Sequence, residues 1–217
     1  MVVDAGANIG MFTIRAARKV GDSGVVIAVE PQPDNITFLR ENIRLNELTN
    51  VKIIIRALYF EDNTTVSFQG NGVGGHLSAT GVNTVKTISL KKIISEFTNR
   101  DIWLKMDIEG AEEFIFAKDQ DISYLKGIRG IAYEIHSRSG LEILNTQLSK
   151  LNLPPSPVYY EHDFLRKLLK ESIKHPVLII TLYREFLPKL ALRVLKGNPT
   201  MESSDHFEPG MQYAWRD

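Results

Sequence analysis

Acidic and histidine side chains follow two of the predicted strands, at the points where those strands end. Asp107 and Glu109 close the apolar segment 101–107, in the run D-I-E-G-A-E, and His136 follows the segment 130–135. In an open α/β sheet the carboxyl ends of the strands face the ligand crevice, so we expect these three side chains to converge there. A carboxylate or an imidazole can act as a general base, and two close carboxylates can also hold a divalent ion.

Structural roles are the alternative for the same residues. Asp107 and Glu109 share a face if the chain is extended, but they could instead cap a helix predicted to begin at Gly110, which would turn Phe114 and Ile115 inward. A lone histidine is more often structural than catalytic. No third oxygen or nitrogen ligand is evident beside the two carboxylates, so we favour base catalysis without a metal. The choice of base among the three candidates stays open.

A second group of candidates opens the chain. Val2 and Val3 predict a short buried strand that runs directly into the glycine-containing turn Asp4–Gly10, D-A-G-A-N-I-G. A helix is predicted to follow over residues 11–20. Four of its residues recur at helical spacing: Met11, Ile14, Ala17 and Arg18. Strand, turn and helix together form a corner that is a ligand site in open α/β sheets.

The residue types in this corner favour S-adenosylmethionine over a dinucleotide. The dinucleotide pattern G-x-G-x-x-G has a middle glycine, whereas Asn8 stands at that position, after Gly6 and Ala7 and before Gly10. Asp4 is an acid at the strand end, and a carboxylate there could accept hydrogen bonds from the ammonium group of S-adenosylmethionine. The alternative is that the two glycines only shape a tight turn and that Asp4 caps the helix.

Three further residues extend the predicted cofactor site. Glu30 ends the second apolar run, at the interval after Gly10 where such folds place the acid that binds ribose hydroxyls, and Pro31 stops the strand. Ala57 follows the predicted third strand, 51–55, and is small enough to leave room for an adenine ring, although a small residue there is as often simple packing. These residues make a nucleoside ligand the expectation.

The remaining segments predict the elements that hold these candidates in place. A helix is predicted over 33–46, and its two faces are expected to divide as follows: Ile36, Leu39, Ile43 and Leu45 toward the sheet, and Asn35, Arg40, Glu41 and Arg44 toward solvent. A hairpin strand is predicted over 64–68. The five glycines of Gln69–Asn83 predict a mobile loop, either a lid over the ligand or a plain connection. Structure resumes in a strand at 85–90 and a helix at 90–97.

Composition excludes several classes of function. The chain has 217 residues, which suits a single domain, and 26 basic residues balance 26 acidic ones, so the overall charge predicts no nucleic-acid partner. The absence of cysteine excludes disulfides, thiolate metal sites and a cysteine nucleophile. No signal-peptide core opens the sequence, and the longest apolar run, Val177–Leu182, is too short to span a bilayer, so a cytoplasmic location is the expectation. Because Met1 directly precedes the first strand, we expect preceding residues to be missing.

Four stretches together resemble the FkbM family of methyltransferases: VVDAGANIGMFTI, AVEPQPDNITFLRENIRLN, LKMDIEGAEEFI and GIAYEIHS. The resemblance covers residues 1–150 and again 213–215, and D-I-E-G-A-E is its more specific part. It implies a Rossmann-like α/β fold, a doubly wound and mostly parallel sheet with helices on both faces, with S-adenosylmethionine as donor and a hydroxyl acceptor on a sugar or polyketide. It further implies that Asp4, Gly6, Asn8, Gly10 and Glu30 bind the cofactor and that Asp107 and Glu109 lie near the transferred methyl.

The sequence departs from this pattern over residues 159–197, where we predict a basic helical insertion in place of a compact hairpin. Residues 163–197 hold eight lysines and arginines against three acids, an excess of +5 in an otherwise neutral chain. Basic amphipathic helices are typical of weak membrane-surface contact or partner docking, and a solvated cover on the sheet is the alternative, which we favour. The substrate is expected to be a small molecule or a glycan. A nicotinamide oxidoreductase and a non-catalytic binding module are the rival functions.

Overall fold

The computed structural model describes residues 1–69, 76–77, 83–97, 101–109, 111–118, 121–135, 137–153 and 210–215. The chain divides into two compact units, residues 1–158 with 211–217 and residues 159–210. The predicted basic insertion at 159–197, with its proposed membrane-facing helices, lies outside the described residues, as do Gly110 and His136. Everything that follows concerns the first unit, which contains residues 211–215 of the last strand.

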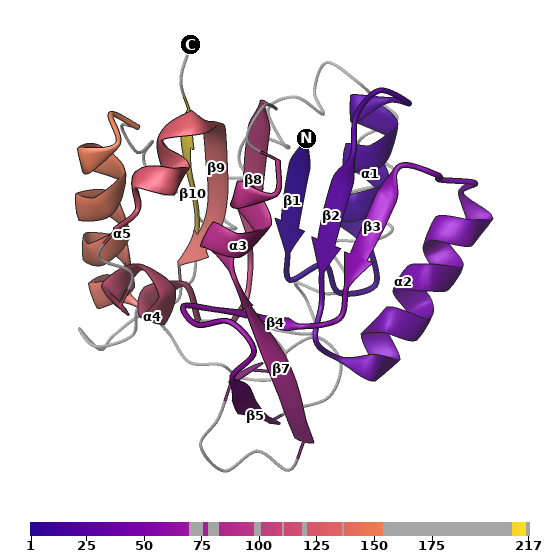
Figure 1. Ribbon diagram of the computed structural model, residues 1–217, viewed down its shortest axis with the longest axis horizontal. Coiled ribbons are helices and arrows are strands. Elements are labelled where there is room, and N and C mark those ends of the chain that lie inside the picture. The colour runs from indigo at the N-terminus through magenta and orange to yellow at the C-terminus, as the bar shows by residue number, and fades with distance from the viewer. Residues whose placement is uncertain are drawn as a thin grey trace, which may run out of the picture. The chain divides into compact units, whose positions relative to one another are not determined.

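Six strands form the main sheet of this unit, in the order β10-β9-β8-β1-β2-β3 (Figure 1). Their bounds are β1 Val2–Ala5, β2 Val26–Val29, β3 Val51–Ile54, β8 Ile102–Met106, β9 Ile128–Ile135 and β10 Gly210–Trp215. All the pairs from β9 to β3 are parallel. The mostly parallel sheet predicted from the sequence is therefore confirmed. Chain order reverses at β1, so the crevice between the ends of β1 and β8 is the topological switch point where ligands bind in open α/β sheets.

Helices cover both faces of the main sheet. Their bounds are α1 Met11–Val20, α2 Pro33–Leu45, α3 Leu90–Ser95, α4 Ala111–Lys118 and α5 Arg138–Lys150, with a 3-10 helix η1 at Ser123–Gly127. The alternate residues Val26 and Ala28 of β2 pack against α1 and α2 respectively, which places those two helices on one face. The connection from β8 through α4 to β9 runs in the opposite direction along the sheet. Because crossovers are right-handed, it brings α4 to the other face.

A smaller sheet has the order β4-β7-β5-β6, with β4 Ala57–Tyr59, β5 Thr65–Gln69, β6 His76–Leu77 and β7 Asn83–Ser89. It lies on the side of the main sheet toward which the arrowheads of β1, β2 and β3 point (Figure 1). The sequence treats residues 69–83 as one loop, but β6 pairs with β5 inside that segment. Ala57 does not end a main-sheet strand as expected, because the chain leaves β3 at Ile54 and Ala57 pairs with Thr87 of β7.

The helices predicted over 11–20, 33–46 and 90–97 and after Gly110 are confirmed, but some of the apolar residues named for them are exposed. In α1 the buried residues are Thr13, Ala16 and Ala17, and Met11 is 62% exposed because it lies about 200° around the helix from Thr13. Leu45 is equally exposed at the end of α2, for the same reason relative to Ile43. In α4 the buried stripe holds Ile115 but leaves Phe114 exposed.

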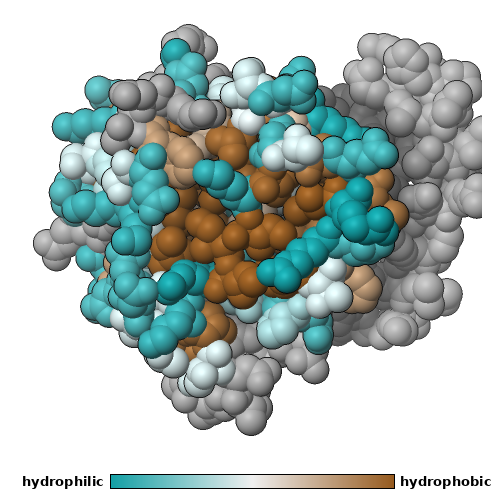
Figure 2. Space-filling view, turned by 45° about the vertical axis from the view of Figure 1, so that its right-hand side comes forward, coloured by the Kyte–Doolittle hydropathy of each residue, from teal (hydrophilic) through white to brown (hydrophobic). Residues whose placement is uncertain are grey.

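Figure 2 shows an area of hydrophobic side chains bordered by hydrophilic ones on one side of the molecule. Large apolar side chains that are exposed include Phe38 of α2 and Trp103 of β8. Among the helices within the described ranges, none has the combination of length and hydrophobicity needed to cross a membrane.

Candidate functional site

The turn after β1 is built from three residues in the left-handed region of backbone space. Gly6, Asn8 and Gly10 have φ angles of 76°, 51° and 95°. Glycine adopts this conformation without strain, and asparagine tolerates it better than most residues, which explains Asn8 at the middle position. A Cβ atom on Gly6 would stand 1.8 Å from the carbonyl oxygen of Asp107. The turn therefore presses directly against the end of β8, which carries the predicted catalytic acids.

The amide groups of this turn are bonded within the protein. The N–H groups of Gly6 and Ala7 both donate to the carbonyl of Val29 at 3.0 Å, and that of Gly10 donates to Ala7 at 2.9 Å. The Asn8 N–H donates to the Glu30 carboxylate at 2.8 Å. A dinucleotide site instead offers such N–H groups to a pyrophosphate. The hydrogen bonds of the turn thus hold β1 and β2 together. The Glu30 carboxylate lies where a dinucleotide site would bind phosphate, and its negative charge would repel that group.

Glu30 lies at the end of β2 and is only 4% exposed. Besides Asn8, its carboxylate accepts hydrogen bonds from the Gln32 N–H at 3.0 Å and from the Asn35 amide at 3.1 Å. This explains why Asn35 is buried, against the sequence expectation. A carboxylate has about four acceptor positions, so these three bonds leave one for a ligand hydroxyl. Pro31 is partly buried beside it.

Asp4 is fully buried, and its cation is supplied by the protein. Oδ2 accepts the hydroxyl of Thr13 at 2.5 Å, and Oδ1 lies 3.3 Å from the Nζ of Lys105, close enough for an ion pair but not oriented for a hydrogen bond. Burial raises the pKa of Asp4, and Lys105 and Thr13 oppose that rise. The sequence predicts that Asp4 binds a cationic ligand. In the structure, Lys105 already supplies a cation at this carboxylate and would compete with such a ligand. Direct contact of Asp4 with a cofactor stays a prediction.

Lys105 is the functional residue that sequence reasoning missed. Its ammonium group donates to the Gly6 carbonyl at 2.9 Å and lies 3.5 Å from Oδ2 of Asp107, in addition to its contact with Asp4. The side chain is only 12% exposed. The available signal was its position, because a lysine inside a central parallel strand lies in a buried layer, where a cation needs a charged or hydrogen-bonding partner. One cation thus links the turn after β1 to the acid after β8.

The structure separates the two acids that the sequence placed on one face. Asp107 continues the strand, and its N–H donates to the Ala5 carbonyl at 3.1 Å. Glu109 has a φ of 55° and an exposed side chain, so the chain is no longer extended at that point. The bend is stabilised by Glu112, whose buried carboxylate accepts the Ile108 N–H at 2.6 Å at the start of α4. The expected shared face of Asp107 and Glu109 is therefore wrong.

Glu134 is brought beside Asp107 instead. It lies near the carboxyl end of β9, directly after Tyr133, which pairs with Met106 of β8, so the same register places Glu134 across from Asp107. Burial, together with the nearby carboxyl groups of Asp107, Glu109 and Glu112, raises the pKa of Glu134 to about 8. A carboxyl group with this pKa carries its proton at neutral pH. Sequence reasoning assigned the chemistry at this strand end to His136 and gave no role to Glu134.

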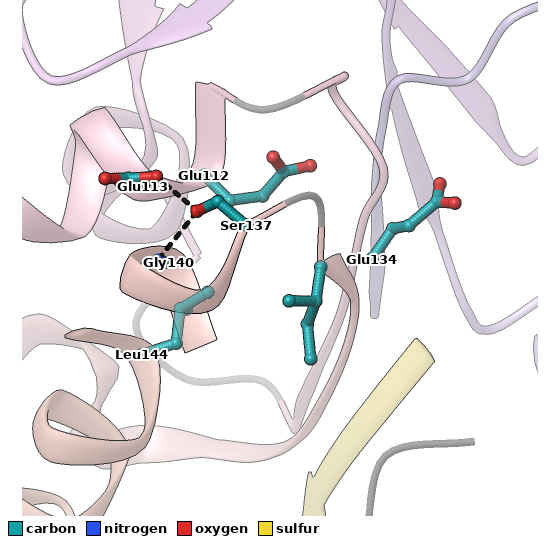
Figure 3. Close-up of a pocket in the computed structure, with 7 residues that line it drawn as sticks. Glu112, Glu113, Glu134, Ser137, Gly140 and Leu144 are labelled. Atoms are coloured by element: carbon teal, nitrogen blue, oxygen red, sulfur yellow. Dashed lines mark hydrogen bonds between the residues drawn. The ribbon is translucent and has the colours of Figure 1, made fainter. Parts of the chain in front are cut away.

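A small pocket adjoins this acid pair. It has a volume of about 80 Å³ and seven lining residues: Glu112, Glu113, Glu134, Ile135, Ser137, Gly140 and Leu144. Sites for whole drug-sized ligands are several times larger, so this pocket suits a single functional group. On one wall Ser137 donates to Glu113 at 2.5 Å and caps α5 by accepting the Gly140 N–H, while Glu112 and Glu134 extend away from that wall (Figure 3). Within the described ranges, no three acidic or histidine side chains form a group suited to a metal ion.

Comparison with known families agrees with this arrangement. The sequence model of the methyltransferase FkbM domain matches residues 4–172. The chain belongs to the FkbM methyltransferase family. The match contains the turn after β1, Glu30, Lys105, Asp107 and the carboxyl end of β9, so every part of the site described above lies inside the family domain. No curated protein matches the sequence.

Solved structures place the fold of this FkbM domain among methyltransferases. The methyltransferase FkbM from Methylobacillus flagellatus KT aligns with a TM-score of 0.51 and 17% identity, over 73% of this chain and 39% of that one. The chain thus spans about two fifths of that protein. Weaker likenesses include a precorrin-6y C5,15-methyltransferase from Geobacter metallireducens GS-15, with a TM-score of 0.44, 11% identity and coverage of 100% and 79%. TYW2 from M. jannaschii, solved in complex with AdoMet, has a TM-score of 0.38, 19% identity and coverage of 72% and 57%.

Proposed function

We propose that this protein transfers the methyl group of S-adenosylmethionine to a hydroxyl group of a small acceptor, such as a sugar, a glycan or another natural product. The observation that carries the proposal is the contact between the turn after β1 and the end of β8. This contact joins the turn after β1, which with Glu30 suits a nucleoside, to Asp107, whose carboxylate can accept a proton. The two halves of a methyl-transfer site are therefore neighbours at the switch point of the sheet.

The residues at the corner fit the nucleoside part of S-adenosylmethionine. Glu30 has an acceptor position left for a ribose hydroxyl, and Pro31 and Ala7 present no charge. The internally bonded amides of the turn and the carboxylate of Glu30 disfavour a pyrophosphate, which supports this donor over NAD. S-adenosylmethionine, when bound, supplies a methyl group on a sulfonium that is open to in-line displacement.

At the acceptor side, the protein has to position an oxygen and remove its proton. As the new C–O bond forms and the C–S bond breaks, the acceptor O–H bond also breaks and its proton passes to a carboxylate. We assign that role to Asp107, whose Oδ2 lies beside Lys105 and whose side chain is 36% exposed. General-base catalysis of this kind contributes typically ~10² to 10⁴ in rate, and in-line positioning contributes the rest.

The acidic character of this edge supports an uncharged or cationic acceptor. Asp107, Glu109 and Glu112 all lie close enough to Glu134 there to act on its charge. A phosphate-rich partner such as nucleic acid would be repelled by these groups, and basic side chains that neutralise phosphates supply most of the affinity in nucleic-acid sites. A hydroxyl-rich molecule meets no such cost. This is the support for a sugar-type acceptor.

Calorimetric titration tests the cofactor half. S-adenosylmethionine and S-adenosylhomocysteine should bind, and NAD should not. Glu30→Gln should weaken binding by about tenfold or more, because a hydrogen bond to a charged group is worth about 1.5–3 kcal/mol. Glu41→Gln, which alters an exposed carboxylate on α2, is the control and should bind normally. Binding of NAD without binding of S-adenosylmethionine would refute the proposal.

Transfer of a radiolabelled methyl group to a panel of sugars and other hydroxyl compounds tests the acceptor half. With an accepted substrate, Asp107→Asn should lower turnover by ~10² or more while the affinity for S-adenosylmethionine stays within a few-fold, since the base acts in the transition state. Asp101→Asn, at the opposite end of β8, is the matched control. Equal losses in both variants would remove the assignment of Asp107.

A further inference from the structure

The peptide group between Asp107 and Ile108 is held at both of its ends. Its carbonyl belongs to Asp107, and a Cβ atom on Gly6 would lie only 1.8 Å from that oxygen, so the turn after β1 packs directly against it. Its N–H belongs to Ile108 and donates to the Glu112 carboxylate at 2.6 Å. Because a peptide group is planar, contacts at both ends fix its orientation as a unit.

This orientation determines where the side chain of Asp107 leaves the backbone. The peptide group before Asp107 is fixed by its own N–H, which donates to the Ala5 carbonyl at 3.1 Å. The peptide group after it is fixed by Glu112. Only two soft dihedral angles separate consecutive peptide groups, so two fixed groups leave the Cα–Cβ bond of Asp107 little freedom. Lys105, 3.5 Å from Oδ2, then acts on the carboxylate itself.

Glu112 is suited to this task by its burial and by the direction in which it reaches. It is only 2% exposed, and a carboxylate is costly to bury unless hydrogen bonds compensate for the lost water. Glu113 lies beside it in the first turn of α4, where an acid of either position favours the helix dipole. The two side chains diverge (Figure 3): Glu113 bonds to Ser137, whereas Glu112 reaches back to the bend after β8. Stabilisation of the helix alone does not require that direction.

We propose that Glu112 is a positioning residue for Asp107, and that its hydrogen bond to the Ile108 N–H holds the Asp107 carboxylate where it can take up the proton of the acceptor. Resting on the proposed function, this role serves Asp107 as the base. Glu112 acts through the backbone of Asp107 and needs no contact with donor or acceptor. The run D-I-E-G-A-E thereby contains both a base and the residue that places it.

Amide hydrogen exchange of the full chain, followed by NMR, tests this placement without any substrate. Glu112→Met has about the same length but removes the acceptor of the Ile108 N–H. Release of that peptide group should loosen the next hydrogen bond as well, so the amides of both Ile108 and Asp107 should exchange ~10-fold faster or more. Glu112→Gln keeps an oxygen acceptor and should hold both rates within a few-fold of the wild type.

Asp121→Ala is the matched control for the exchange experiment. It also removes a carboxylate that accepts a backbone N–H at the start of a helix, that of Ser123 at 3.1 Å, and it should leave both rates unchanged. Faster exchange of Ile108 alone in Glu112→Met would overturn the proposal. The wild type keeps the test open even if Glu112→Met does not fold, because an Ile108 amide that exchanges as in an unstructured peptide would overturn the proposal too.

Turnover gives a readout that a merely structural role would not move. With an accepted substrate, and well below the unfolding temperature, Glu112→Met should lower kcat by ~10-fold or more, because a misplaced base is a poor one. The affinity for S-adenosylmethionine should stay within a few-fold, and Glu112→Gln should recover most of kcat. Added to Asp107→Asn, Glu112→Met should cause no further loss, since it acts through that residue. A full further loss would overturn the proposal.

The placement of Asp107 and the proposed function can fail separately. If both amides respond as expected but S-adenosylmethionine does not bind, the proposed function is wrong and the placement of Asp107 by Glu112 stands. If Asp107→Asn abolishes methyl transfer while a folded Glu112→Met protein keeps the kcat of the wild type, the proposed function stands and the role of Glu112 is refuted.

Discussion

Gly6 is the position where the turn after β1 meets the end of β8, the two halves of the proposed site, so adding a single methyl group there should separate them. A Cβ atom would lie 1.8 Å from the Asp107 carbonyl oxygen, whereas ordinary contacts begin at 3.4 Å. The ends of β1 and β8 would have to part by more than 1 Å, at the expense of the bond from the Asp107 N–H to the Ala5 carbonyl.

The expected cost has two parts. The left-handed conformation of Gly6 disfavours alanine by about 1 kcal/mol, and overpacking against a backbone atom adds about 3 kcal/mol. The sum, about 4 kcal/mol, is a large share of the ~5–15 kcal/mol that stabilises a typical domain. Urea denaturation followed by circular dichroism measures it, and calorimetry should show a parallel loss of S-adenosylmethionine affinity.

Two other glycines separate these contributions. Gly21 has a φ of 65° but nothing within 4 Å of its Cβ position, so Gly21→Ala should cost only the conformational part, about 1 kcal/mol. Gly127 has open space and no positive φ, so Gly127→Ala should stabilise the protein by about 0.4–1 kcal/mol. A cost for Gly6→Ala no larger than that for Gly21→Ala would refute the close approach of the two strand ends.

Three further predictions concern stability. Because the pKa of Glu134 is raised from 4.5 to about 8, its contribution to the free energy of unfolding is fully present below pH 4.5 and is lost as pH rises through 8. At about 1.4 kcal/mol per pKa unit, discounted for the partial exposure of the side chain, the free energy of unfolding should fall by about 2 kcal/mol over this range. Glu134→Gln should remove this pH dependence. Thr13→Val should cost about 2 kcal/mol in urea, since it deprives the buried Asp4 of a donor. Ser137→Ala should lower the thermal midpoint by removing the cap of α5, worth about 1 kcal/mol.

Most of the fold could be predicted from hydrophobic periodicity and from the glycine and proline residues that mark the ends of helices and strands. Val26–Val29 is a continuous apolar run, as a strand buried on both faces requires, and the order of strands and helices follows from it. The smaller sheet could not be predicted in the same way. Its strand β6 has two residues, and its pairing partner β5 lies across a glycine-rich segment, so no local pattern marks it.

The candidate site could be predicted in outline but not in its charge balance. Strand ends indicated Asp4, Glu30 and Asp107, because position along a strand is a local property. The pairing of Lys105 with Asp4 depends on the lateral register of β8 against β1, in which residue 4 lies opposite residue 105. The placement of Glu134 across from Asp107 depends on the neighbouring register of β8 and β9. Register between distant segments is set by tertiary packing, which a single sequence does not display.

The pairing of Lys105 with Asp4 has an evolutionary consequence. A buried carboxylate deprived of its cation is strongly destabilising, whereas loss of both charges together is often tolerated. The two positions are 101 residues apart, yet a substitution at one should persist only where the other has changed too. Within an alignment of FkbM domains, positions 4 and 105 should therefore vary as a pair, and a chain with an apolar residue at 105 should have lost the acid at 4. Along the branches of a family tree, the charges at positions 4 and 105 should therefore have been gained close together.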